Sequence, residues 1–200
     1  MLDYTFDISH KNEKIKSICG VDEAGRGPLA GPVVAAACIL PDDFFLEELN
    51  DSKKLTEKKR EKIFDIIINN ALDFSIAMAS VEEIEDINIL NASMLAMKRA
   101  IDGLETKPDL ALIDGNTSRG FTIPTKTVVG GDAKSPSIAA ASILAKVTRD
   151  RMCYEFDKQF PEYGFAKHKG YGTKVHMDAI KKYGITPIHR KSFLKFLNND

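Results

Sequence analysis

The sequence has no tryptophan and only three cysteines among its 200 residues. Cys19, Cys38 and Cys153 are odd in number, widely spaced and set in apolar surroundings. This pattern indicates neither a disulfide framework nor a zinc site. It is typical of reduced core residues, so we expect a cytoplasmic protein.

Long hydrophobic runs are also missing. No stretch approaches the roughly 18 apolar residues that a membrane span needs. The N-terminus lacks the basic region and apolar segment that mark a signal peptide. We therefore expect no membrane partner. The length fits a single domain over residues 1–200 with a substantial core, and we expect a monomer.

Charge is unevenly spread along the chain, although the whole has a net charge of −1. Residues 146–200 carry a net +6 and the remainder a net −7. Such asymmetry suits an acidic metal site beside a basic platform for a polyanion, with about 146–200 as the substrate-binding part. The expected phosphate contacts are Lys146, Arg149, Lys167, Lys169, Lys174, His189 and Arg190. Tyr171, between two glycines, is placed to stack on a base or a sugar.

Apolar patterning predicts an α/β protein with five strands, near 16–22, 33–40, 74–79, 110–113 and 125–129. The short connection between the first two strands favours an antiparallel pair. Helices are expected after Thr56, over about 88–103, from about 135, and in a short segment ending at Tyr183. Residues 1–14 are expected to form a polar, loosely held lead-in.

The chain is organised around residues 20–32, where two acids close an apolar run and a Gly-Arg-Gly turn follows. Strand alternation places Asp22 on one face and Glu23 on the other. Both reach one site only if the chain turns at Ala24–Gly25, which the sequence leaves open. A turn with two solvated acids is the ordinary alternative, but the buried run and the glycine loop favour a site.

An acid beside a glycine follows a strand three times, at Asp22-Glu23, Asp114 and Asp132. Singly, Asp114 and Asp132 could equally be turn-capping residues. If the strands are neighbours, four carboxylates converge, and two charges about 4 Å apart repel by roughly 4 kcal/mol at a dielectric of 20. An all-oxygen set favours Mg²⁺ or Mn²⁺. Two such ions can generate a hydroxide and stabilise the leaving oxygen of a phosphodiester.

Residues 22–33, Asp-Glu-Ala-Gly-Arg-Gly-Pro-Leu-Ala-Gly-Pro-Val, resemble the signature of the bacterial ribonuclease HII family. Further stretches resemble that family in the same order, over about residues 18 to 194. They are residues 51–55, 113–116, 131–132, 137–150, 169–173 and 189–193.

The resemblance implies a ribonuclease H-like fold: a five-stranded mixed sheet flanked by helices, with a helical C-terminal segment. It implies endonucleolytic cleavage of RNA in RNA/DNA hybrids and at single ribonucleotides embedded in duplex DNA. The products would carry 3′-hydroxyl and 5′-phosphate ends. The family's four metal-binding, catalytic carboxylates fall on Asp22, Glu23, Asp114 and Asp132. Its 2′-hydroxyl contacts fall on Gly25, Arg26 and Gly27, and its stacking tyrosine on Tyr171. Lys53, Asn116, Ser142, Lys146 and Arg190 lie in matching motifs as further substrate contacts.

Two other classes of function are open from the residues. A nuclease or integrase acting on DNA alone would share the fold without reading a 2′-hydroxyl. A non-catalytic nucleic-acid-binding module would keep the shape without the chemistry, and the presence of all four acids argues against it. The sequence does not decide which metal is used or whether a sliding clamp recruits the protein.

Overall fold

The computed structural model describes residues 2–49, 52 and 55–195. Five strands form one sheet in the order β3-β2-β1-β4-β5. They are β1 (Ile18–Ala24), β2 (Val33–Ile39), β3 (Asp73–Ala79), β4 (Leu110–Asp114) and β5 (Thr125–Val128). β2 pairs antiparallel with β1 and β3, whereas β4 pairs parallel with β1 and β5. The predicted mixed α/β sheet is confirmed.

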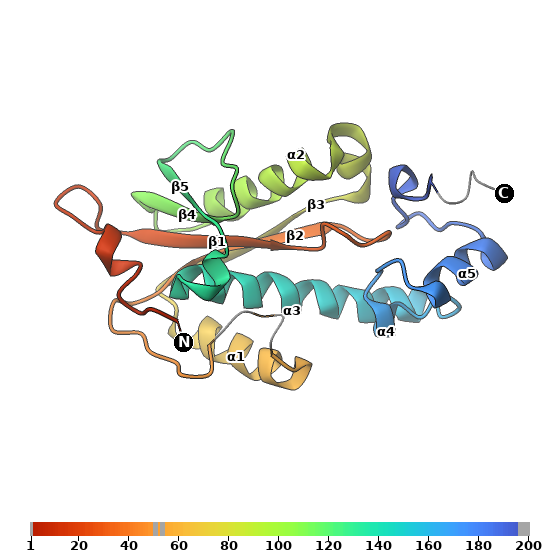
Figure 1. Cartoon of the computed structure of the whole chain (residues 1–200), viewed down its shortest axis with the longest axis horizontal. Coiled ribbons are helices and arrows are strands. Elements are labelled where there is room, and N and C mark those ends of the chain that lie inside the picture. Colours follow the sequence, from red (N-terminus) through yellow and green to blue (C-terminus); the bar gives the residue numbers. More distant parts are fainter. Residues whose placement is uncertain (1, 50–51, 53–54, 196–200) are drawn as a thin grey trace.

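The helices are α1 (Glu57–Asn70), α2 (Val81–Asp102), α3 (Pro136–Gln159), α4 (Phe165–His168) and α5 (Lys174–Tyr183). In Figure 1, α2 covers one face of the sheet, α1 and α3 lie against the other, and α4 and α5 extend beyond the end of α3. Short 3₁₀ turns span Ile8–His10, Gly131–Ala133 and Lys191–Phe193. Among the residues so described, no helix is long and apolar enough to cross a membrane.

The start of α2 lies seven residues before the predicted one. Ser80 caps it, with Glu83 completing a reciprocal capping box. Asn88 interrupts the helix with φ 66°, and the predicted start falls on this break. The predicted helix therefore matches only the part of α2 after Asn88, although Val81 and Ile84 before it are buried as well.

Alternation in β1 divides the core into two layers, as the sequence predicts. Cys19 and Val21 belong to the cluster packed on α2. Gly20 faces α3 so closely that a Cβ there would lie 2.1 Å from the carbonyl carbon of Ser137. The close approach of α3 to β1 therefore requires glycine, and it places Asp22, two residues on, on the same face.

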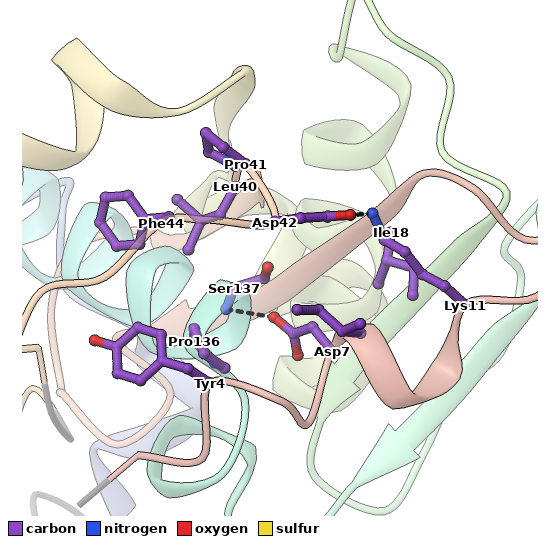
Figure 2. Close-up of a pocket in the computed structure, with 11 residues that line it drawn as sticks. Tyr4, Asp7, Lys11, Ile18, Leu40, Pro41, Asp42, Phe44, Pro136 and Ser137 are labelled. Carbon is purple, nitrogen blue, oxygen red and sulfur yellow. Dashed lines mark hydrogen bonds and ion pairs between the residues drawn. The ribbon is translucent and has the colours of Figure 1, made fainter.

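The N-terminal segment is not a loose lead-in, and that prediction is wrong. Leu2 is buried, and the Tyr4 hydroxyl donates to the Leu46 carbonyl at 2.5 Å. The Asp7 carboxylate accepts from the Ser135 hydroxyl at 2.5 Å. It also accepts from the Ser137 N–H at 2.9 Å, a bond that Figure 2 shows. Polar residues that resembled a solvated tail in the sequence instead satisfy the free N–H groups where α3 begins.

Asp7→Ala is expected to destabilise the fold by about 1 kcal/mol, within the roughly 0.5–2 kcal/mol measured for helix caps. For a chain of this size that corresponds to a fall in Tm of roughly 2–4 °C, which a thermal denaturation curve would detect. Asp3→Ala is the matched control, because Asp3 is exposed and accepts only from its neighbour Thr5. Equal Tm values for the two variants would contradict the capping role.

Candidate active site

A cavity of about 250 Å³ lies at the carboxyl end of β1. Most of the residues predicted for the site line it. The full lining consists of Asp22, Glu23, Ala24, Gly25, Arg26, Gly27, Ser52, Ser142, Lys146, Arg149 and Tyr171, of which Ala24 and Ser52 were not predicted as site residues. The structure thus brings the acid pair, the glycine loop and the tyrosine to one place.

Asp22 and Glu23 reach the same cavity because β1 extends beyond the end of its pairing with β4. The last β1 residue with a registered partner in β4 is Val21, opposite Ile113, and β1 continues to Ala24. Side chains from both faces can therefore approach the cavity past the open strand edge. The turn itself comes at Gly25, with φ 101°, which answers the question that alternation leaves open.

The two acids are held in an electrostatically unfavourable state. Asp22 is 6% exposed. Burial raises its pKa well above the ordinary value, and repulsion from Glu23 and Asp114 adds to this effect. Burial also raises the pKa of Glu23, opposed by the Arg26 guanidinium 3.3 Å away. A cation bound here would relieve the repulsion that the fold imposes.

Asp114 and Asp132 lie at the same end of the sheet. Asp114 ends β4, and its carboxylate accepts from the Gly131 N–H at 2.7 Å. Asp132 is the next residue, buried in the 3₁₀ turn. Neither lines the cavity. In the part of the chain that the structure describes, no three acidic, histidine or cysteine side chains stand close enough to hold one metal ion. Holding an ion with all four carboxylates therefore requires their side chains to move.

Arg190 supports the glycine loop from behind. Its side chain is fully buried. The guanidinium donates to the carbonyls of Gly25 at 2.7 Å, Arg26 at 3.0 Å and Gly31 at 2.8 Å. Burial and the nearby Arg149 lower its pKa to about 9. The expectation of a direct substrate contact from Arg190 is wrong, because no part of it reaches solvent.

Arg149 supports the segment that follows the glycine loop, residues 30–32, through similar bonds to backbone carbonyls. It is 2% exposed and donates to the carbonyls of Ala30 at 3.0 Å, Pro32 at 3.3 Å and Lys169 at 3.0 Å. His189 is also buried. Both were expected to contact phosphates, and burial corrects this. Counting charges cannot distinguish a guanidinium that binds carbonyls from one that faces solvent.

The remaining predicted contacts differ in availability. Lys146 lines the cavity but pairs with Asp150 at 2.6 Å. Lys167, Lys174 and Asn116 are exposed, whereas the Lys169 ammonium lies over the Tyr154 ring. Ser142 is buried and hydrogen-bonds the Ser52 hydroxyl at 2.9 Å. Tyr171 is 47% exposed. Lys53 lies outside the described residues.

Two residues near the site escaped the sequence interpretation. Asp150 is buried between Lys146 and Arg60, whose guanidinium lies 3.5 Å away. Arg60 also donates to the carbonyls of Ser52 at 3.1 Å and Leu55 at 2.5 Å. The only signal was the i,i+4 spacing of Lys146 and Asp150 on one helix.

The mixed sheet, with acids at the adjacent ends of β1 and β4, defines a nuclease of the ribonuclease H class. The model of the family Ribonuclease HII matches residues 19–196. The chain belongs to the ribonuclease HII family and is a ribonuclease H enzyme, which hydrolyses the RNA strand of RNA/DNA hybrids.

Three relatives illustrate the match. Ribonuclease HII of Endomicrobium trichonymphae is 57% identical over 191 residues, covering 95% of this chain and 91% of its own. The ribonuclease H2 structure from Pyrococcus horikoshii OT3 has a TM-score of 0.74 at 27% identity, covering 92% of this chain and 98% of its own. RNase HII of Archaeoglobus fulgidus, solved in a complex with PCNA, has a TM-score of 0.72 at 25% identity, covering 90% and 95%.

Proposed function

We propose that the protein cuts at single ribonucleotides embedded in duplex DNA as well as along RNA/DNA hybrids, leaving 3′-hydroxyl and 5′-phosphate ends. The observation that supports this most directly is the closeness of Tyr171 to the loop from Gly25 to Gly27, the two elements that would recognise the ribonucleotide. A Cβ added at Gly27 would lie 3.5 Å from the Tyr171 ring. Backbone groups of the loop from Gly25 to Gly27 can bond a 2′-hydroxyl, which both donates and accepts. The ring beside them can stack on the next nucleotide.

We further propose that Asp22, Glu23, Asp114 and Asp132 hold two Mg²⁺ or Mn²⁺ ions. The set is all oxygen, which suits hard cations, and burial, the main cause of the raised pKa of Asp22 and of Glu23, leaves their charges poorly stabilised unless a cation is bound. When bound, such ions supply an activated hydroxide and stabilise the leaving oxygen. The acids orient that chemistry, and the arginine-supported loop holds the ribose beside it.

The C-terminal part from Lys146 supplies the substrate platform in this proposal. It contributes Tyr171 and Lys146 to the cavity, and the exposed Lys167 and Lys174 are available for phosphates. The three cysteines are all free and buried. That state supports a reducing, cytoplasmic setting.

A duplex with one ribonucleotide, compared with its all-DNA twin, tests the proposal. We expect nicking of the first only, abolished by EDTA and restored by Mg²⁺ or Mn²⁺, with a 3′-hydroxyl and a 5′-phosphate at the nick. The readout is a denaturing gel. Cutting of the all-DNA twin would favour a DNA nuclease, and binding without cutting would favour a non-catalytic module.

A further inference from the structure

A cluster of imidazoles lies behind Tyr171, apart from the acids. Three of the four histidines in the sequence, His168, His176 and His189, meet there. His176 and His189 are buried, and they pack against the aromatic rings of Tyr163 and Phe165. None of the three lines the acid-bearing cavity.

The hydrogen bonds of this cluster allow only one neutral arrangement of two of the rings. The Thr186 N–H donates to His189 Nδ1 at 2.9 Å, so the proton of that ring is on Nε2. His189 Nε2 lies 3.1 Å from His176 Nε2, which must then accept. The His176 proton is therefore on Nδ1, and it donates to the Tyr171 carbonyl at 2.9 Å.

The third ring holds the other side of the same turn. The Gly170 N–H donates to His168 Nδ1 at 3.2 Å, so His168 Nε2 carries a proton and donates to the Tyr163 carbonyl at 2.7 Å. His168 stacks on His176 with ring centroids 4.3 Å apart. Two stacked imidazoles thus bond the backbone of this turn, one at the Gly170 N–H and the other at the Tyr171 carbonyl.

We propose that the chain Thr186–His189–His176, the histidine relay, positions Tyr171 for its part in recognising a single ribonucleotide. The relay fixes the Tyr171 carbonyl, which also accepts from the Thr173 N–H at 2.8 Å. The exposed ring is thereby aimed past Gly27 into the cavity. This inference rests on the proposed stacking role of Tyr171.

The relay works only with neutral rings. A proton added to His176 would set its Nε2–H against the His189 Nε2–H at 3.1 Å, and one added to His189 would set its Nδ1–H against the Thr186 N–H at 2.9 Å. Burial lowers the pKa of His176 and of His189 to about 4. The neighbouring His168 contributes to both shifts and His176 to that of His189, whereas the hydrogen bond to the Tyr171 carbonyl opposes the shift of His176. The neutral form therefore prevails near neutral pH.

The test compares two replacements of the central ring. His176→Leu keeps apolar bulk but offers no donor, whereas the amide of His176→Asn places an N–H where Nδ1 lies. We expect Leu to lose about tenfold in cleavage of a single embedded ribonucleotide, part of the roughly 10- to 100-fold that full loss of stacking brings. Cleavage of a long hybrid should change little, and Asn should restore most of the loss. His10→Leu, in the N-terminal segment, is the control for losing an imidazole.

Two further measurements separate this inference from the proposed function. In ¹⁵N-imidazole NMR at neutral pH, His176 should show the Nδ1–H form and His189 the Nε2–H form. The reverse forms, or a charged ring, would overturn the relay whatever the activity shows. Adding His176→Leu to Tyr171→Ala should cause no further loss in the rate of cleavage at a single embedded ribonucleotide. An additive loss, or equal losses for Leu and Asn, would also overturn it. Should Tyr171→Ala itself leave discrimination intact, the stacking role fails while the NMR still decides the relay geometry.

Discussion

Asp22→Asn is expected to abolish nearly all cleavage while leaving the fold intact. The amide matches the carboxylate in volume but has no charge with which to hold a cation. Metal ions stabilise such transition states by several kcal/mol, and each 1.4 kcal/mol is about tenfold in rate. We therefore expect a loss of about a thousandfold or more in single-turnover cleavage at saturating Mg²⁺.

Asp109→Asn is the matched control, because Asp109 is exposed and accepts only from the Lys16 and Ser17 N–H groups. It should cleave at nearly the wild-type rate. Wild-type turnover by the Asp22 variant, in a preparation free of other nucleases, would refute the metal-binding assignment.

The same Asp22 variant should be at least as stable as the wild type when metal is removed. A folded-state pKa raised above the ordinary 3.8 means that the fold favours the neutral carboxyl. The wild type therefore loses stability as pH rises above that value, and asparagine does not. The advantage of the variant in Tm, measured in EDTA, should be absent in acid and grow toward neutral pH.

Tyr171→Ala is expected to lose about one to two powers of ten in cleavage of a single embedded ribonucleotide, and much less on a long hybrid. Stacking on a base or sugar is worth roughly 1–3 kcal/mol by alanine substitution. A long hybrid offers many positions at which the enzyme can bind and cut, whereas an isolated ribonucleotide offers only one. The ratio of the two rates is the measurement.

Tyr171→Phe separates the ring from its hydroxyl. If stacking is the whole role, Phe keeps most of the activity, and equal damage from Phe and Ala would show the stacking account to be wrong. Tyr183→Ala serves as the control, since Tyr183 is another half-exposed tyrosine of the C-terminal part, 12 residues on and away from the cavity.

Local patterns predicted the sheet and the grouping of the acid pair with the glycine loop. Alternation in β1 separates Val21 from Asp22 because strand side chains have a period of two. Parallel pairing of β1, β4 and β5 brings their carboxyl ends to one edge, so Asp114 lies beside the pair. These features depend on short stretches of chain, which a sequence displays directly.

Contacts between distant segments were not predictable in this way. Arg149 and Arg190 resemble any basic surface residue until their carbonyl partners are known. Asp7 resembles a residue of a solvated tail until its hydrogen bond to the first turn of α3 is known. Each of these side chains is polar in a buried or interfacial place, where a hydrogen-bond partner and not hydropathy decides its position.

The bonds from Arg190 to the glycine loop also set when, during synthesis of the chain, that loop can acquire its support. The guanidinium and the Gly25 carbonyl that it binds are 165 residues apart in the chain. The sheet can begin to form while the ribosome is still adding residues, but the loop acquires its support only after Arg190 has emerged. Contacts of such long separation form late. A chain that is still being synthesised therefore carries Asp22 and Glu23 before the loop beside them has the support of Arg190.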